Sequence, residues 1–239
     1  MSSQYLSKNY VEETKFGFWF LRSHTWQHHV LRVAINDLRS LFSEPLPVAP
    51  VLLDAGCGQG KSFKLLQQVF APSRLIGLDA DPHSLELSKA EAAHQGLEVE
   101  LIGSDCATLD VADASVDRLI SLFGRRPVTE IERVLVPGGY CIVAVPGEED
   151  LIELREQVQQ AGHRRSRWRA IMEEMEAAGL DCIARQIWQQ QVDLEPDAIL
   201  DALAMTYRAG RHSQQARLEA VTAMPVTLAA DLLLFQQQP

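Results

Sequence analysis

Short apolar runs and stretches of helical periodicity alternate along the chain from Val51 onward. The apolar runs cover residues 51–54, 75–79, 99–102, 116–122 and 140–145. This alternation predicts βαβ units and a parallel sheet. Right-handed crossovers place the loops that follow the strands along one edge of such a sheet, so we expect a ligand site at that edge.

Local signals predict where several elements begin and end. Asp81 with Pro82 starts the helix after the second strand, and Gly96 ends it.

The pattern also predicts the remaining elements of the chain. A short helix is expected over 128–136. After Pro146, helices are expected at 148–160, 168–178 and 196–209, with two late strands at 182–192 and 226–235 that can pair antiparallel at one edge of the sheet. The pattern of residues 14–42 predicts a segment rich in aromatic residues followed by a long amphipathic helix. We therefore expect a helical cover over residues 1–50 and one domain over residues 51–239.

A glycine-rich loop follows the first predicted strand. Residues 54–60 read Asp-Ala-Gly-Cys-Gly-Gln-Gly and open a helix. Glycines at alternate positions permit a tight turn and let a ligand lie against the backbone. The pattern differs from a dinucleotide fingerprint, which needs glycine where Lys61 stands, and from a phosphate-binding P-loop, which needs glycine where Ala55 stands. The loop begins instead with Asp54, whose carboxylate can accept hydrogen bonds from a cationic amino group.

Two further acidic positions follow predicted strands. Asp79 ends the second strand, where a carboxylate can accept from both hydroxyls of a ribose. Asp105 and Cys106 follow the third strand and can offer a side-chain acceptor and a backbone donor to an adenine edge. Together with the glycine loop, these residues favour an adenosine-containing ligand.

These motifs carry a resemblance to a known family. The segments DAGCGQG, LIGLDADP, GSDCATLD, SVDRLIS and RVLVPGGY resemble those of class I S-adenosylmethionine-dependent methyltransferases, including the type 11-like group. The resemblance implies a Rossmann-like, doubly wound α/β fold with seven strands, the last antiparallel. It also implies S-adenosylmethionine as the cofactor, with the methionine moiety at the glycines, the ribose at Asp79 and the adenine at Asp105 and Cys106. The cofactor-binding residues expected on this basis are Asp54, Gly56, Cys57, Gly58, Gly60, Asp79, Ala80, Asp105, Cys106 and Ser121.

A closer resemblance extends past the core motifs. The short link from 119–123 to the helix at 128–136, the segment 145–155 and the segment 204–209 are similar to the bacterial 23S rRNA guanine-N1 methyltransferases. That family carries an N-terminal zinc module with four ligands and CxxC spacing. This chain has no cysteine before Cys57 and therefore lacks the module.

The acceptor side of the site is expected at the loop 121–126 and the N-terminal segment. Candidate substrate contacts are Trp19, His24, His28, Phe123, Arg125 and Arg126. His24 and His28 are spaced i,i+4, which suits a substrate contact, a general base or an ordinary partly buried pair. No third ligand stands nearby in the sequence, so we expect no metal site. The sequence assigns no catalytic residue.

Charge limits the partners that can be expected. The chain of 239 residues has a formal net charge of -10, which disfavours bulk nucleic-acid binding. The segment 163–169 nevertheless holds four arginines and a tryptophan, so it is either an anion or RNA patch or a solvated helix start. We predict a cytoplasmic transferase, without membrane partners, that methylates a small or medium-sized acceptor by in-line displacement. rRNA guanine-N1 methylation and a non-catalytic regulator that binds S-adenosylmethionine are the alternatives.

Overall fold

The computed structural model describes residues 49–104, 108–124, 126–159, 166–196, 199 and 222–238. These residues belong to two compact units, each of which is described by itself. We define the core unit as the described residues of 31–146, 166–188 and 230–239, and the second unit as those of 147–165 and 189–229. The predicted boundary at residue 50 falls at the start of the described residues and stays a prediction. The predicted helical cover over residues 1–50 and most of the predicted helix at 196–209 lie outside the described residues.

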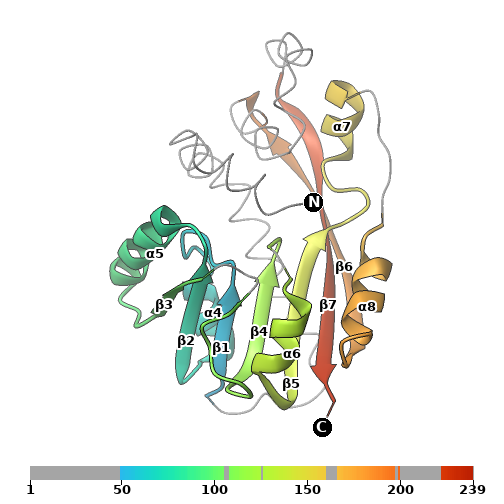
Figure 1. The fold of residues 1–239 in the computed structure, drawn as a ribbon. Coiled ribbons are helices and arrows are strands. Elements are labelled where there is room, and N and C mark those ends of the chain that lie inside the picture. The colour runs from blue at the N-terminus through green and yellow to red at the C-terminus, as the bar shows by residue number, and fades with distance from the viewer. Residues whose placement is uncertain are drawn as a thin grey trace. The chain divides into compact units, whose positions relative to one another are not determined.

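The described strands form one seven-stranded sheet in the order β3-β2-β1-β4-β5-β7-β6 (Figure 1). The strands are β1 (Val51–Ala55), β2 (Arg74–Asp79), β3 (Glu100–Gly103), β4 (Val116–Leu122), β5 (Leu135–Pro146), β6 (Leu180–Leu194) and β7 (Met224–Gln237). Strands β1 to β5 pair in parallel, and β7 pairs antiparallel with β5. The predicted Rossmann-like architecture, with both late strands at one edge, is therefore confirmed.

The strand order fixes where a ligand can bind. From β1 the chain moves outward through β2 to β3, whereas from β4 it moves outward in the opposite direction to β5. Right-handed crossovers then place α4 (Phe63–Phe70) and α5 (Pro82–Gln95) on one face and α6 (Val128–Val134) on the other. The order reverses between β1 and β4, and ligands of open α/β sheets bind at the carboxyl ends of the strands at this point.

Helix α5 confirms its predicted ends. The Asp81 carboxylate accepts the Ser84 backbone N–H at 2.9 Å, and Pro82 stands in the first turn. Gly96 closes the helix in the left-handed conformation with φ of 66°. Local capping chemistry alone was enough to predict these boundaries.

Helix α6 is shorter than predicted because a strand begins inside the expected helix. Leu135 already pairs with Val116 of β4, and the pairing then shifts register before Arg118 meets Tyr140. The helix therefore ends at Val134 rather than at residue 136. Sheet pairing outweighs the helical pattern of this segment, a result that depends on contacts distant in sequence.

Helix α8 (Trp168–Glu176) packs on the sheet within the core unit (Figure 1). Ile171 and Met175 belong to the same buried cluster as Val143 and Val145 of β5. This packing brings the start of α8 close to the ends of β4 and β5.

Two carboxylates organise the second unit. Glu153 of α7 (Ile152–Gln159) accepts the Thr227 backbone N–H at 2.8 Å and the Thr227 hydroxyl at 2.6 Å. Asp150 accepts the Ala229 N–H at 3.0 Å. Burial raises the pKa of Asp150 to about 6, against the opposing effect of this hydrogen bond. The first half of β7 is thus held by carboxylate acceptors as well as by backbone pairing.

In the part of the chain that the structure describes, every helix is too short or too polar to cross a bilayer.

Candidate cofactor and acceptor site

The glycine loop closes tightly against the end of β2. The backbone N–H groups of Gly56 and Cys57 both donate to the Leu78 carbonyl oxygen, at 2.8 and 2.9 Å. Gly56, Gly58 and Gly60 adopt φ angles of 85°, 55° and 73°. This left-handed region favours glycine, so the alternate glycines are a requirement of the backbone path.

The glycines differ in what surrounds them. A Cβ atom at Gly60 would lie 2.5 Å from the Phe63 ring, so this glycine is needed for packing onto α4. A Cβ atom at Gly58 would meet no atom of the described residues within 4 Å. The backbone at Gly58 therefore faces open space that a bound molecule can use.

Asp79 lies at the end of β2 beside this space. One of its carboxylate oxygens accepts the Gly58 N–H at 2.9 Å, and the other accepts the Asp81 N–H at 3.0 Å. The backbone thereby fixes both oxygens, and each retains capacity for one further donor. Such a carboxylate suits the two hydroxyls of a ribose, as predicted for Asp79. The neighbouring Ala80 is exposed, and Ser104 donates its N–H to the Asp79 carbonyl oxygen at 3.2 Å.

Asp54 lies beneath the loop and is only 2% exposed. It accepts a hydrogen bond from the Ser62 hydroxyl at 2.5 Å. Burial raises the pKa of Asp54 to about 6; the Ser62 hydrogen bond opposes the rise, and the negative charge of Asp79 adds to it. No cationic group contributes to the pKa of Asp54 among the described residues, so its ionised carboxylate is not balanced by a positive charge there. It can therefore attract a cationic ligand, although a direct contact to an amino group stays a prediction.

The Cys57 thiol is part of the loop's support. It is buried and lies 3.8 Å from the Ser88 hydroxyl, which itself donates to the Gly58 carbonyl oxygen at 2.6 Å. Burial and the charges of Asp54 and Asp79 raise the pKa of Cys57 far above its ordinary value. The thiol stays protonated at neutral pH and is unsuited to act as a nucleophile.

Gln59 was missed by the sequence reasoning. Its side chain is buried, 6% exposed, and its Oε1 atom has no hydrogen-bond donor among the described residues. The loop therefore offers a free acceptor for a donor group of a ligand. The only sequence signal was its place between two glycines.

The loop after β4 joins the cofactor side to a cavity. Ser121 is buried on β4, and a Cβ atom at Gly124 would lie 3.5 Å from the Ser121 hydroxyl oxygen and 3.3 Å from the Ala55 carbonyl oxygen. A Cβ atom at Gly56 would lie 3.9 Å from the Gly124 Cα. Gly124 is thus in close contact with the end of β1 and the start of the glycine loop, and a Cβ atom there would be tightly packed against the Ala55 carbonyl oxygen.

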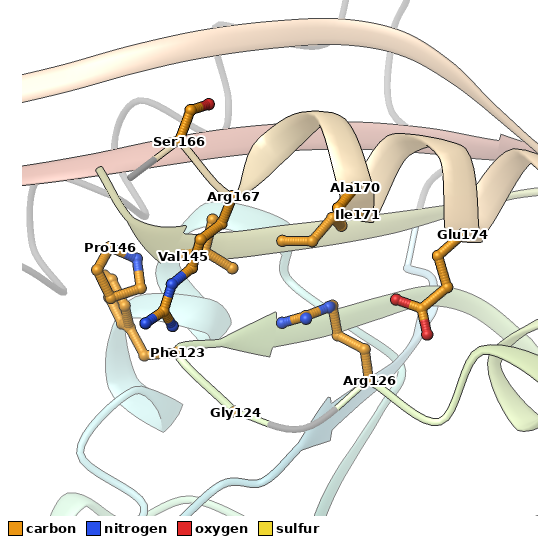
Figure 2. A pocket seen from close by; sticks show the side chains of 10 residues that line it. All are labelled: Phe123, Gly124, Arg126, Val145, Pro146, Ser166, Arg167, Ala170, Ile171 and Glu174. Atoms are coloured by element: carbon orange, nitrogen blue, oxygen red, sulfur yellow. The ribbon is translucent and has the colours of Figure 1, made fainter. Parts of the chain in front are cut away.

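A cavity of about 360 Å³ opens on the other side of this loop. Figure 2 shows the side chains of Phe123, Arg126, Arg167 and Glu174 around it. Phe123 donates its backbone N–H to the Ala144 carbonyl oxygen and has a φ angle of 58°, which is strained for a large side chain. Strain of this kind is common at functional sites. The predicted substrate contacts Phe123 and Arg126 are thus brought together at this cavity.

The remaining predicted site residues lie outside the described residues and stay predictions. They are Trp19, His24, His28, Asp105, Cys106 and Arg125.

The fold and the loop place glycine backbone and carboxylate groups at the switch point of the sheet, where open α/β sheets bind their ligands. Residues 49–195 match the family described as "Methyltransferase domain". The chain belongs to this family, since the match covers more than half of it.

Relatives agree with the predicted resemblances. The chain is 31% identical over 142 residues to a malonyl-[acyl-carrier protein] O-methyltransferase of Xylella fastidiosa, which covers 56% of this chain and 47% of the relative. It is 32% identical over 111 residues to a Micromonospora griseorubida protein provisionally named a 23S rRNA (guanine-N(1)-)-methyltransferase, covering 46% of this chain and 37% of that protein. The matches therefore span less than half the length of each relative.

Solved structures support the fold. A provisionally named methyltransferase of Bacillus halodurans superposes with a TM-score of 0.64, covering 86% of this chain and 99% of that one. The two sequences are 12% identical, so this likeness concerns the fold alone.

Proposed function

We propose that the chain is an S-adenosylmethionine-dependent methyltransferase that acts on a small acceptor. The observation that carries the proposal is the Asp79 carboxylate, which two backbone N–H groups fix at the edge of the open space beside Gly58. Its remaining acceptor capacity, the free Gln59 oxygen and the negative charge of Asp54 fit the hydroxyls, the amino group and the positive charge of this cofactor.

When bound, S-adenosylmethionine supplies its methyl group by in-line displacement, in which the C–S electron pair stays on sulfur. The chain's own residues then have to hold the cofactor and orient the acceptor toward its methyl group. Asp79 accepts from the ribose, the bare backbone at Gly58 leaves room for the cofactor, and Gly124 keeps the acceptor cavity close to the glycine loop. Positioning of this kind can supply much of the rate enhancement when the acceptor needs no proton removed.

Isothermal titration calorimetry with S-adenosylhomocysteine tests the proposal. The wild type should bind, and Asp79→Ala should weaken binding at least tenfold, because it leaves the ribose hydroxyls without a charged acceptor. Glu98→Ala, which removes an exposed carboxylate outside the site, is the matched control and should bind like the wild type. Absence of binding by the wild type, or equal affinity of Asp79→Ala, would refute the proposed cofactor site.

A second candidate function is guanine methylation in rRNA. The relative provisionally named for that activity and the arginines at 164–169 favour it. Binding of an rRNA fragment should then fall steeply with rising salt concentration, because phosphate contacts release counterions. A flat or absent response would reject this candidate.

A third candidate is a regulator that binds the cofactor without catalysis. Formation of S-adenosylhomocysteine from S-adenosylmethionine in the presence of a cell extract, above the rate without protein, would exclude it. The same measurement with Asp79→Ala shows whether the turnover depends on the proposed cofactor site.

A further inference from the structure

The cavity beside the loop after β4 has apolar walls and a cationic interior. Its apolar walls are Phe123, Val145, Pro146, Ala170 and Ile171. Figure 2 shows the guanidinium groups of Arg126 and Arg167 pointing into the same space, one from the loop after β4 and the other from the start of α8. Glu174 lies on the Arg126 side of the cavity.

The guanidinium groups of the two arginines have no hydrogen-bond partner among the described residues. Within the described ranges, neither guanidinium group forms a hydrogen bond or an ion pair, and the Arg126 Nε atom is buried without an acceptor. Burial lowers the pKa of Arg126, and the charge of Arg167 lowers it further, while Glu174 opposes the change. Glu174 compensates part of the positive charge of the two arginines, and a bound anion would compensate the rest.

The charges around the cavity suit one negative charge better than two. Among the described residues that line the cavity, two guanidinium groups and the Glu174 carboxylate leave a net charge of one positive unit. A carboxylate matches this charge, and its two oxygens match the planar forks of arginine. A phosphate dianion would leave an excess negative charge beside Glu174. The apolar walls provide a surface for the hydrocarbon part of an acid.

The cavity also lies next to the end of β1, from which the glycine loop starts. Gly124 forms part of its wall, and a Cβ atom there would come within 3.3 Å of the Ala55 carbonyl oxygen at the end of β1. The lining of the cavity is therefore in contact, through Gly124, with the end of β1 and the start of the glycine loop.

We propose, resting on the proposed function, that this cavity is the acceptor subsite and that the acceptor is a small carboxylic acid with an apolar body. Its carboxylate binds between Arg126 and Arg167, and its apolar body contacts Phe123, Val145 and Ile171. Arg126 and Arg167 thus select an acidic acceptor. The carboxylate serves as the recognition group.

The test uses hexanoate as the probe and neutral hexanamide as its control. Titration calorimetry is performed with the full chain saturated with S-adenosylhomocysteine. The wild type should bind hexanoate and show at least tenfold weaker binding of hexanamide. Arg126→Gln should weaken hexanoate binding at least tenfold, and Arg167→Gln at least threefold, since Arg167 is more exposed.

Arg169→Gln is the matched control, because Arg169 belongs to the same basic segment and lies over the Trp168 ring at 5.1 Å rather than at the cavity. It should leave hexanoate affinity unchanged. Glu174→Gln changes an exposed side chain, so the variant should fold like the wild type and any change in its hexanoate affinity can be read as an effect on binding. It should tighten hexanoate binding about threefold, because it removes the negative charge beside the anion.

Each outcome decides the proposal. Equal affinity for hexanoate and hexanamide, no binding of hexanoate, or equal losses in Arg167→Gln and Arg169→Gln would overturn it. So would binding of a single-stranded RNA oligonucleotide that both of these variants weaken equally while hexanoate is ignored, since the arginines would then form an RNA surface. Failure of the wild type to bind S-adenosylhomocysteine would instead refute the proposed function, and the two failures are therefore distinguishable.

Discussion

Replacement of Asp54 by asparagine should make the protein more stable above pH 6. In the folded protein, burial raises the pKa of this carboxyl from its ordinary value of 3.8 to about 6. A raised pKa means that the folded state favours the protonated form, so stability is lost as the pH rises from about 4 to about 6. The difference corresponds to about 3 kcal/mol of unfolding free energy, which Asp54→Asn should recover at pH 7.5. The Ser62 hydroxyl can still donate to the asparagine oxygen, so the variant keeps the hydrogen bond.

Urea denaturation of the wild type and Asp54→Asn at several pH values between 4.5 and 7.5 measures this effect. The stability gain of the variant should be small at pH 4.5, should grow with pH and should level off above pH 6. Asp150→Asn is the matched control, since burial also raises the pKa of Asp150 to about 6. It should show the same pH-dependent gain in stability. Equal stabilities of Asp54→Asn and the wild type at pH 7.5 would refute the reasoning.

The two variants should differ in cofactor binding. Ionised Asp54 attracts the positive charges of S-adenosylmethionine, so the affinity of the wild type should rise as the pH rises through about 6. Asp54→Asn should bind the cofactor more weakly at pH 7.5 and lose this pH dependence, whereas Asp150→Asn should keep it. An unchanged pH profile in Asp54→Asn would show that its carboxylate does not act on the cofactor.

Three glycine substitutions separate ligand binding from packing. Gly58→Ala and Gly96→Ala both place a methyl group in open space at a positive φ, so each should cost about 1 kcal/mol of unfolding free energy. Only Gly58→Ala should weaken S-adenosylhomocysteine binding, at least tenfold by calorimetry, and equal affinities of the two variants would contradict this. Gly77→Ala places a Cβ atom 2.7 Å from the Phe63 ring and should cost about 1–3 kcal/mol in urea denaturation, whereas a cost below 0.5 kcal/mol, roughly the effect of an ordinary surface change, would contradict this packing.

The sequence predicted the parts of the site that local rules govern. Alternating glycines require a positive-φ turn, and Asp79 follows from its place at the end of a strand, so both could be identified without a structure. The capping of α5 by Asp81 is equally local.

Other features depend on contacts between distant segments. Arg126 and Arg167 share a cavity only because α8 packs against the ends of β4 and β5, and the sequence offered Arg167 merely as one member of a basic run. The positive φ of Phe123 and the early start of β5 at Leu135 likewise result from pairing in the sheet. Periodicity carries no information about such contacts.

The position of the cofactor is the central claim, and backbone amide NMR tests it most directly. S-adenosylhomocysteine is titrated into ¹⁵N-labelled protein, and the shift of each amide signal is followed. The largest shifts should occur at Gly56, Gly58 and Gly60 of the glycine loop and at Asp79 and Asp81, where the backbone holds the carboxylate. Saturable binding with these signals unmoved and the largest shifts elsewhere would contradict the account.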